Sequence, residues 1–288
     1  MASPEAPDPN PHVPDYVAAA MACDAHCHVF GPAATFPYAP NRAYTPQDAP
    51  KERLAALHQV LRIERAVIVQ ASCHGTDNRA MLDAIAHSGG RYRGVAIVDE
   101  TFGDADYAAL HAGGIRGVRF NFVRHLGGMP DMNVFHRVVQ RIVPLGWHLI
   151  VHLDAVDIVE LSSLLRSVPV PFVVDHMGRV KASEGVAQPA FRALLDLMRL
   201  ENCWVKVCGA ERVSTAGPPF HDAIPFAKAV IETAPDRVLW GSDWPHPNVG
   251  RHMPNDGDLL DLVPLMAPDE AMRHKLLVEN PARLYDWA

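Results

Sequence analysis

The stretch WHLIVHLD (147–154) decides the fold class, because it is a short, unbroken apolar run that ends in polar residues. A strand covered on both faces has this pattern, whereas a strand with one face in solvent alternates apolar and polar residues. Similar runs occur at AVIVQ (66–70), PFVVD (171–175) and RVLWG (237–241). We therefore expect a parallel sheet whose strands are buried on both sides.

Eight segments of this kind alternate along the chain with stretches whose apolar residues recur at helical spacing. The predicted strands are residues 23–30, 65–72, 93–99, 115–122, 147–153, 171–177, 203–209 and 237–243. The predicted helices are 51–61, 78–87, 104–111, 133–143, 156–166, 189–200 and 220–233, with further helical segments in 258–277. Eight such units predict an α/β fold, the closed (β/α)8 TIM barrel. A doubly wound open sheet is the main alternative, but no G-x-G-x-x-G or P-loop motif follows the first strand. We therefore expect no organic cofactor.

The composition limits the class of protein. Of the 288 residues, 49% are hydrophobic and 20% are charged, as in an ordinary globular domain. The net charge of −7 argues against nucleic acid or an anionic membrane as a partner. Five scattered cysteines do not indicate a disulfide framework, so we expect a cytoplasmic protein. We expect either a monomer or a homo-oligomer. The proline-rich residues 1–20 lack the features of a signal peptide and predict an extended arm before a single domain at 21–288.

Residues that bind metals or move protons lie at the ends of several predicted strands. In a barrel these ends meet at one mouth. In DAHCH (24–28), the i, i+2 spacing puts both histidines on one face of the strand. Imidazoles with a carboxylate and an open position for water suit a divalent metal, and an aspartate there can also take a proton from the attacking water. The predicted members of the site are His26, His28, His152, His176 and Asp243.

Arginines at the same mouth predict an anionic substrate. Arg119 lies on the fourth predicted strand, and Arg179 and Arg212 follow the sixth and seventh. The planar guanidinium binds carboxylates with two parallel hydrogen bonds. One of the three could instead form a structural ion pair, but we do not expect this of all three. No G-x-S-x-G motif is present, and Cys73 beside His74 is not placed for nucleophilic catalysis, because neighbours on a strand point to opposite faces.

Longer motifs resemble the amidohydrolase superfamily. They are DAHCHVFGP (24–32), VIVQASCHGTDN (67–78), GIRGVRFNF (114–122), DHMGR (175–179), LWGSDWPHPN (239–248) and NPARLYDW (280–287). Within amidohydrolase-related family 2, they are similar to the 2-pyrone-4,6-dicarboxylate hydrolases and related lactonases. The resemblance runs from about Cys23 to the end of the chain. It implies a barrel of the metallo-dependent hydrolase type and hydrolysis of a lactone that carries carboxylates.

The resemblance also implies roles for individual residues. Asp243 would activate water, and His26, His28 and His176 would polarise the lactone carbonyl. The substrate's carboxylates would be held by Tyr44, Ser72, Arg119, Arg179 and Arg212.

The chain departs from the pyrone dicarboxylate hydrolases at two positions. His125 stands where they have an arginine, for which the adjacent Arg124 is the expected substitute in substrate binding. His152 stands where they have a tyrosine. Those enzymes work without a metal. A histidine there restores a ligand of the metal-dependent relatives, so one Zn²⁺ held by His26, His28, His152 and Asp243 is a further expectation.

The leading hypothesis is a lactonase, a hydrolase of cyclic esters, acting in aromatic compound catabolism on a small anionic lactone such as 2-pyrone-4,6-dicarboxylate. Sulfomuconolactone and sugar-acid lactones are alternative substrates. A metal-dependent decarboxylase or hydratase of an unsaturated dicarboxylic acid would use a similar set of residues. A barrel that only binds anions, as a sensor or scaffold, is the third hypothesis. Metal occupancy and oligomeric state stay open.

Overall fold

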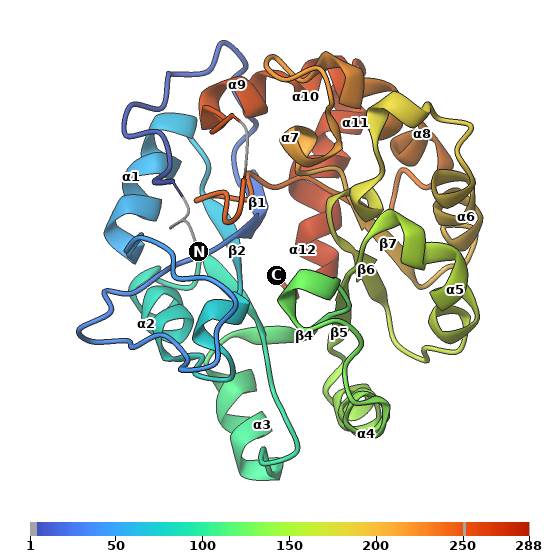
Figure 1. The fold of residues 1–288 in the computed structure, drawn as a ribbon. Coiled ribbons are helices and arrows are strands. Elements are labelled where there is room, and N and C mark those ends of the chain that lie inside the picture. The colour runs from blue at the N-terminus through green and yellow to red at the C-terminus, as the bar shows by residue number, and fades with distance from the viewer. Residues whose placement is uncertain (1–4, 250–251, 288) are drawn as a thin grey trace.

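Eight parallel strands form a single sheet in the order of the sequence. The structure is a computed structural model, and it describes residues 5–249 and 252–287. Helices surround the ring of strands (Figure 1). The strands are β1 (Cys23–Cys27), β2 (Arg65–Val69), β3 (Tyr92–Ala96), β4 (Ile115–Asn121), β5 (His148–His152), β6 (Phe172–Val174), β7 (Cys203–Lys206) and β8 (Val238–Leu239).

Backbone hydrogen bonds join the first strand to the segment that begins at the last one. Ala25 N donates to Trp240 O (2.9 Å), Asp243 N to His26 O (2.8 Å), and His28 N to Trp244 O (2.8 Å). Gly241 permits this close approach, because a Cβ there would lie 2.5 Å from His26 N. The sheet therefore closes into the (β/α)8 barrel that the sequence predicts.

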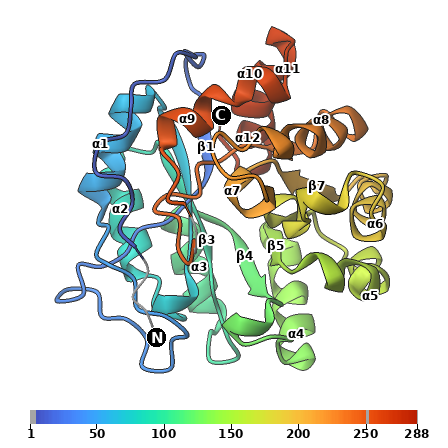
Figure 2. The ribbon, with the colours of Figure 1, turned by 45° about the horizontal axis from the view of Figure 1, so that its top comes forward.

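Seven helices follow the first seven strands in the expected positions, and Figure 2 shows them on the outside of the barrel. They are α1 (Lys51–Leu61), α2 (Arg79–His87), α3 (Asp104–Ala112), α4 (Met132–Ile142), α5 (Ala155–Arg166), α6 (Pro189–Leu197) and α8 (Ile224–Thr233). A short helix, α7 (Ala210–Val213), precedes α8. The chain ends with α9 (Asp256–Asp261), α10 (Val263–Met266), α11 (Glu270–His274), a π-helical segment (Lys275–Glu279) and α12 (Asn280–Leu284).

Several strands are shorter than predicted, and the difference is largest at their carboxyl ends. The sequence predicts a strand at 171–177, but β6 stops at Val174. His176, Met177 and Gly178 have φ of 52°, 52° and 66°, which lies in the left-handed region and cannot continue a strand. The polar residues that the sequence places at strand ends are thus carried by turns at the barrel mouth.

Apolar side chains fill the space inside the barrel and the space between strands and helices. The interior cluster consists of inward-facing residues of the strands together with Tyr285, which is fully buried. A larger cluster lies between the sheet and the helices. All five cysteines are buried and free, as expected from the sequence. None of the described helices combines the length and the apolarity needed to cross a bilayer.

The N-terminal segment runs over the surface beside α9. His12 N donates to Asn255 Oδ1 (3.0 Å), and Tyr16 N donates to Asp261 Oδ1 (2.8 Å). The part of the predicted arm at 5–20 is therefore attached to its own chain, whereas residues 1–4 lie outside the described residues.

Candidate active site

Three imidazoles surround one carboxylate at the barrel mouth. The Oδ1 atom of Asp243 lies 3.4 Å from His26 Nε2 and 3.3 Å from His28 Nε2. It lies 3.8 Å from His176 Nε2. All four side chains are at most 2% exposed. The structure thus brings together the four residues to which the sequence analysis gives catalytic roles.

The Asp243 carboxylate is held in its ionised form. Burial alone would raise its pKa, but Arg212 and the nearby imidazoles outweigh burial and hold the pKa well below the usual range. Arg212 Nε donates a hydrogen bond to Asp243 Oδ2 (2.6 Å), and Arg212 Nη2 lies 2.5 Å from the same oxygen. Oδ1 is left to face the histidines. Asp243 also has a φ of 65°, a conformation that a non-glycine residue rarely adopts without support from its surroundings.

Two of the imidazoles are neutral at pH 7. Burial, followed by the positive charge of Lys206, lowers the pKa of His26 to about 4. Burial also holds the pKa of His176 well below its usual range. A neutral imidazole has one N–H donor and one acceptor, so the direction of each hydrogen bond depends on which nitrogen carries the proton. The site therefore combines an ionised base with neutral hydrogen-bonding groups.

A small cavity of about 100 Å³ lies over this cluster. Five of the predicted substrate-binding residues lie on its walls: Tyr44, Ser72, Arg119, Arg179 and Arg212. A larger outer cavity of about 620 Å³ shares Arg179, Arg212 and Asn248 with it, and Lys181 and Thr215 also line this outer space. The reacting group of a ligand can thus lie at the inner cluster while the rest extends outward past the arginines.

All three cavity arginines also contact an aspartate, although the sequence analysis does not expect this of every one. Arg119 donates to Asp175 Oδ2 from Nε (3.2 Å) and Nη2 (3.0 Å). Arg179 Nε lies 3.1 Å from Asp154 Oδ1, and Arg212 binds Asp243 as described above. These pairs fix the guanidinium groups at the cavity wall before any ligand enters.

Arg124 is not a wall of the cavity, which corrects the prediction that it binds the substrate. Its side chain is 78% exposed, and Nη2 lies 3.6 Å from Asp157 Oδ1. The adjacent His125 lines the cavity instead. Both residues belong to a short 3-10 turn, η2 (Arg124–Leu126), in which neighbouring side chains point in different directions.

His152 does not join the predicted metal ligands. Its Nε2 lies 3.3 Å from Arg179 Nη1. A guanidinium has only donors, so the lone pair of this nitrogen is already engaged. Among the described residues, the ligand atoms of His26, His28 and Asp243 lie within 4.8 Å of one another, and no such group includes His152. Three of the four predicted ligands thus lie close together, and binding of a metal by them stays a prediction.

Lys206 is a member of the site that the sequence analysis does not identify. It ends β7 and is fully buried, and its Nζ lies 2.9 Å from His26 Nδ1 and 3.4 Å from Asp175 Oδ1. Burial would raise the pKa of Asp175, but His26, Lys206 and Arg119 hold it well below the usual range. The signal in the sequence is a lysine inside an otherwise apolar strand, CWVKV (203–207).

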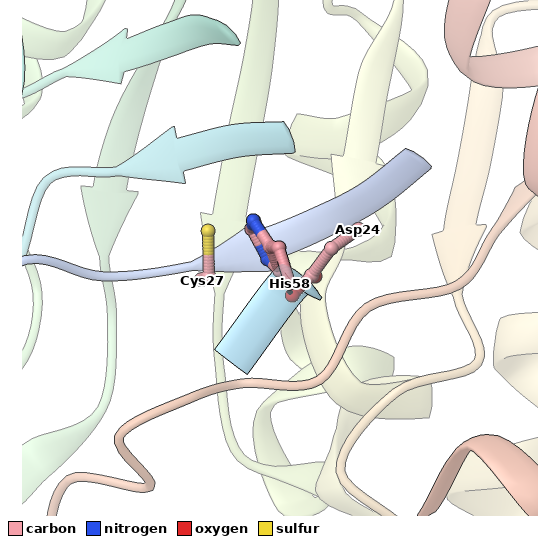
Figure 3. Close-up of side chains that lie close together, drawn as sticks. All are labelled: Asp24, Cys27 and His58. Atoms are coloured by element: carbon pink, nitrogen blue, oxygen red, sulfur yellow. Dashed lines mark hydrogen bonds and ion pairs between the residues drawn. The ribbon is translucent and has the colours of Figure 1, made fainter. Parts of the chain in front are cut away.

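A second group of possible metal ligands lies outside the cavity, between β1 and α1. Figure 3 shows Asp24 and Cys27 on β1 with His58 from α1. Each already has a partner in the protein: His58 Nε2 lies 3.3 Å from Asp24 Oδ2, and Cys27 Sγ lies 3.6 Å from Val67 O. Ser242 donates to Asp24 from both N (2.9 Å) and Oγ (2.5 Å). The Asp24 carboxylate therefore links β1 to the segment that carries Asp243.

We expect Asp24→Asn to lower the free energy of unfolding by about 3 kcal/mol, because an amide nitrogen would replace an oxygen that accepts buried hydrogen bonds. Urea unfolding at pH 7 measures this loss. The pKa of Asp24 is lowered by His58 and Ser242 against the effect of burial. Its contribution is thus present above the pKa of an unfolded aspartate and disappears as the pH falls through the folded pKa. Unchanged stability at pH 7 would contradict this role.

Comparisons with known proteins identify the family of this chain. The family model of the amidohydrolases matches residues 23–287. A 2-pyrone-4,6-dicarboxylate hydrolase from Comamonas testosteroni is 48% identical, over 96% of this chain and 93% of its own. A 4-sulfomuconolactone hydrolase from Rhizobium radiobacter is 44% identical, over 92% of this chain and 89% of its own. A probable 2-pyrone-4,6-dicarboxylic acid hydrolase from Acinetobacter baumannii, solved with citric acid bound, is 27% identical with a TM-score of 0.82, and the match covers 93% of this chain and all of that one (100%). The family predicted from the motifs is confirmed, and the chain belongs to the amidohydrolases.

Proposed function

We propose that this protein is a lactonase that hydrolyses a small lactone bearing anionic groups, with 2-pyrone-4,6-dicarboxylate as the first candidate. The observation that carries the proposal is the ionised Asp243 carboxylate, whose Oδ1 faces three imidazoles beneath a cavity walled by three arginines. The names of the two similar hydrolases support a lactone substrate. The citric acid bound to the solved relative supports an anionic one.

The reaction follows from the positions of the charges. A water molecule beside Asp243 Oδ1 gives its proton to this oxygen and attacks the lactone carbonyl carbon. The carbonyl oxygen gains negative charge, which an imidazole N–H stabilises by hydrogen bonding. The bond to the ring oxygen then breaks, and the ring oxygen takes the proton from Asp243. The products are an enol or alcohol and a carboxylic acid on the same molecule, and the acid then releases its proton to solvent at pH 7. Arg179 and Arg212 hold the anionic groups, so that the carbonyl lies next to the water.

The residues also fit one divalent ion, which the resemblance to the metal-dependent members of the superfamily implies. Nε2 of His26 is buried and has no hydrogen-bond partner among the described residues, and it lies near His28 Nε2 and Asp243 Oδ1. Two imidazoles and a carboxylate, with an open position, are a common donor set for catalytic Zn²⁺. We propose that His26, His28 and Asp243 would hold the ion when the lone pair of His26 is on Nε2 rather than on Nδ1. When bound, it would lower the pKa of a water ligand to around 7 and polarise the carbonyl.

Further expectations come from the sequence and belong to the same proposal. We propose a cytoplasmic location, which the five free cysteines support. A role in the breakdown of aromatic compounds agrees with the names of the two similar hydrolases. Light scattering would measure whether the protein is a monomer or a homo-oligomer.

The test is hydrolysis of 2-pyrone-4,6-dicarboxylate by the purified protein, followed by loss of the pyrone absorbance, together with the metal content of the protein. Sulfomuconolactone and a sugar-acid lactone are assayed in parallel, before and after chelation. Turnover of any of these lactones supports the proposal, and the relative values of kcat/KM identify the substrate. Release of carbon dioxide or hydration of a double bond without lactone hydrolysis would overturn it.

A further inference from the structure

The hydrogen bonds around His26 Nδ1 decide what its other nitrogen can do. This atom has two close neighbours of opposite hydrogen-bonding character, Lys206 Nζ at 2.9 Å and Asp175 Oδ1 at 3.2 Å. An ammonium has only donors, whereas a carboxylate has only acceptors. A bond from Lys206 requires an unprotonated Nδ1 and therefore a proton on Nε2. A bond to Asp175 requires a proton on Nδ1 and leaves Nε2 with a lone pair.

The geometry favours the lysine. The contact of Lys206 with His26 Nδ1 has the distance and angles of a hydrogen bond. In the part of the chain that the structure describes, Asp175 Oδ1 has no hydrogen-bond partner, although it lies close to the same nitrogen. The other oxygen of Asp175 already accepts two hydrogen bonds from Arg119. On the opposite side of the ring, Nε2 faces Asp243 Oδ1 at 3.4 Å, and a carboxylate oxygen favours an N–H at that position.

His28, which comes directly after β1, has the opposite arrangement. His28 Nδ1 lies 2.7 Å from the carbonyl oxygen of Val69, which can only accept. His28 therefore carries a proton on Nδ1 and donates it in a hydrogen bond to Val69 O. Metal-ligating histidines usually make a hydrogen bond of this kind, which directs Nε2 to the site. His26 could adopt the same form only if its Nδ1–H donated a hydrogen bond to Asp175. Two histidines separated by one residue thus present different chemistry to Asp243.

We propose that Lys206 is a positioning residue that holds His26 with its proton on Nε2, as a hydrogen-bond donor to the lactone carbonyl, and that Lys206 thereby opposes binding of a metal by His26. The role of His26 toward the carbonyl rests on the proposed function. The proton position and the metal affinity do not depend on it, so each part can fail separately.

The test compares the wild-type protein with Lys206→Met, which keeps the length and apolar stem of the side chain and removes its donor. The ¹⁵N chemical shifts of the histidine ring nitrogens report which nitrogen is protonated, and His26→Gln identifies the His26 signals among the 16 histidines. We expect a protonated Nε2 in the wild type and a protonated Nδ1 in Lys206→Met. Titration with Zn²⁺ alone should show at least about tenfold tighter binding to the variant, the usual size of an outer-shell effect on metal affinity.

Lys181→Met is the matched control, because it makes the same change of side chain at the outer cavity without touching His26. We expect it to leave the proton of His26 on Nε2. An equal gain in Zn²⁺ affinity in both variants would assign the effect to charge alone and overturn the role of Lys206. A wild-type His26 protonated on Nδ1 would overturn the proposal directly, even if Lys206→Met does not fold. A wild type with Nε2 protonated but without lactone hydrolysis would overturn the proposed function and leave the assignment of Lys206 standing.

Discussion

Asp243→Asn is expected to lower kcat for lactone hydrolysis by about 1000-fold, within the range that a well-placed general base contributes. An amide cannot accept the proton of water, but it has nearly the same shape as the carboxylate. The arginines on the cavity walls remain, so KM should change much less than kcat. Steady-state kinetics on 2-pyrone-4,6-dicarboxylate, or on whichever lactone is turned over, measures both.

The control for this substitution is Asp157→Asn, which removes an aspartate that contacts an arginine outside the cavity. We expect its kcat to stay close to that of the wild type, because Asp157 lines neither the inner nor the outer cavity. Thermal unfolding establishes that both variants are folded. A kcat for Asp243→Asn within tenfold of the wild type would mean that another group activates the water.

Arg212→Met should have two effects that can be measured separately. It removes a guanidinium from the cavity wall, and we expect kcat/KM to fall about 100-fold, as for the loss of one partner from a buried charge pair. It also removes the charge that holds down the pKa of Asp243. Asp243 acts as a carboxylate, so activity is lost as the pH falls through this pKa. A higher pKa therefore moves the acid limb of the pH profile upward, by about one unit or more.

Arg212→Lys separates the two effects. A lysine keeps the positive charge but not the planar fork that binds two oxygens at once. The acid limb should then stay closer to that of the wild type, while kcat/KM still falls. An acid limb at the same pH in Arg212→Met and in the wild type would show that Arg212 does not control the ionisation of Asp243.

The barrel could be predicted from the sequence because its signals are local. Runs such as HLIVH are covered on both faces, and helix α1 begins and ends where the sequence predicts. The ends of the strands are less predictable. The left-handed turn at 176–178 is stabilised by the surrounding structure, and no pattern of polarity distinguishes it from a continuation of the strand.

In the candidate site, too, local features could be predicted and contacts between distant segments could not. Strand-end positions brought His26, His28, His176 and Asp243 together correctly. Pairings between distant segments could not be seen, for example that of Arg119 with Asp175, which lie 56 residues apart. Whether Arg124 or His125 enters the cavity depends on the rotation of a single turn. Lys206 was missed because its significance depends entirely on the imidazole beside it.

The closure of the barrel has a consequence for synthesis of the protein. The strand that carries His26, with His28 directly after it, is synthesised long before its hydrogen-bonded partner, the segment 240–244. Asp24, which links the two, has no serine to accept from until Ser242 leaves the ribosome. A nascent chain that stops before this point contains most of the helices and every histidine on the walls of the inner cavity, but no base and no closed ring. We therefore expect catalysis only after the segment 240–244 has left the exit tunnel.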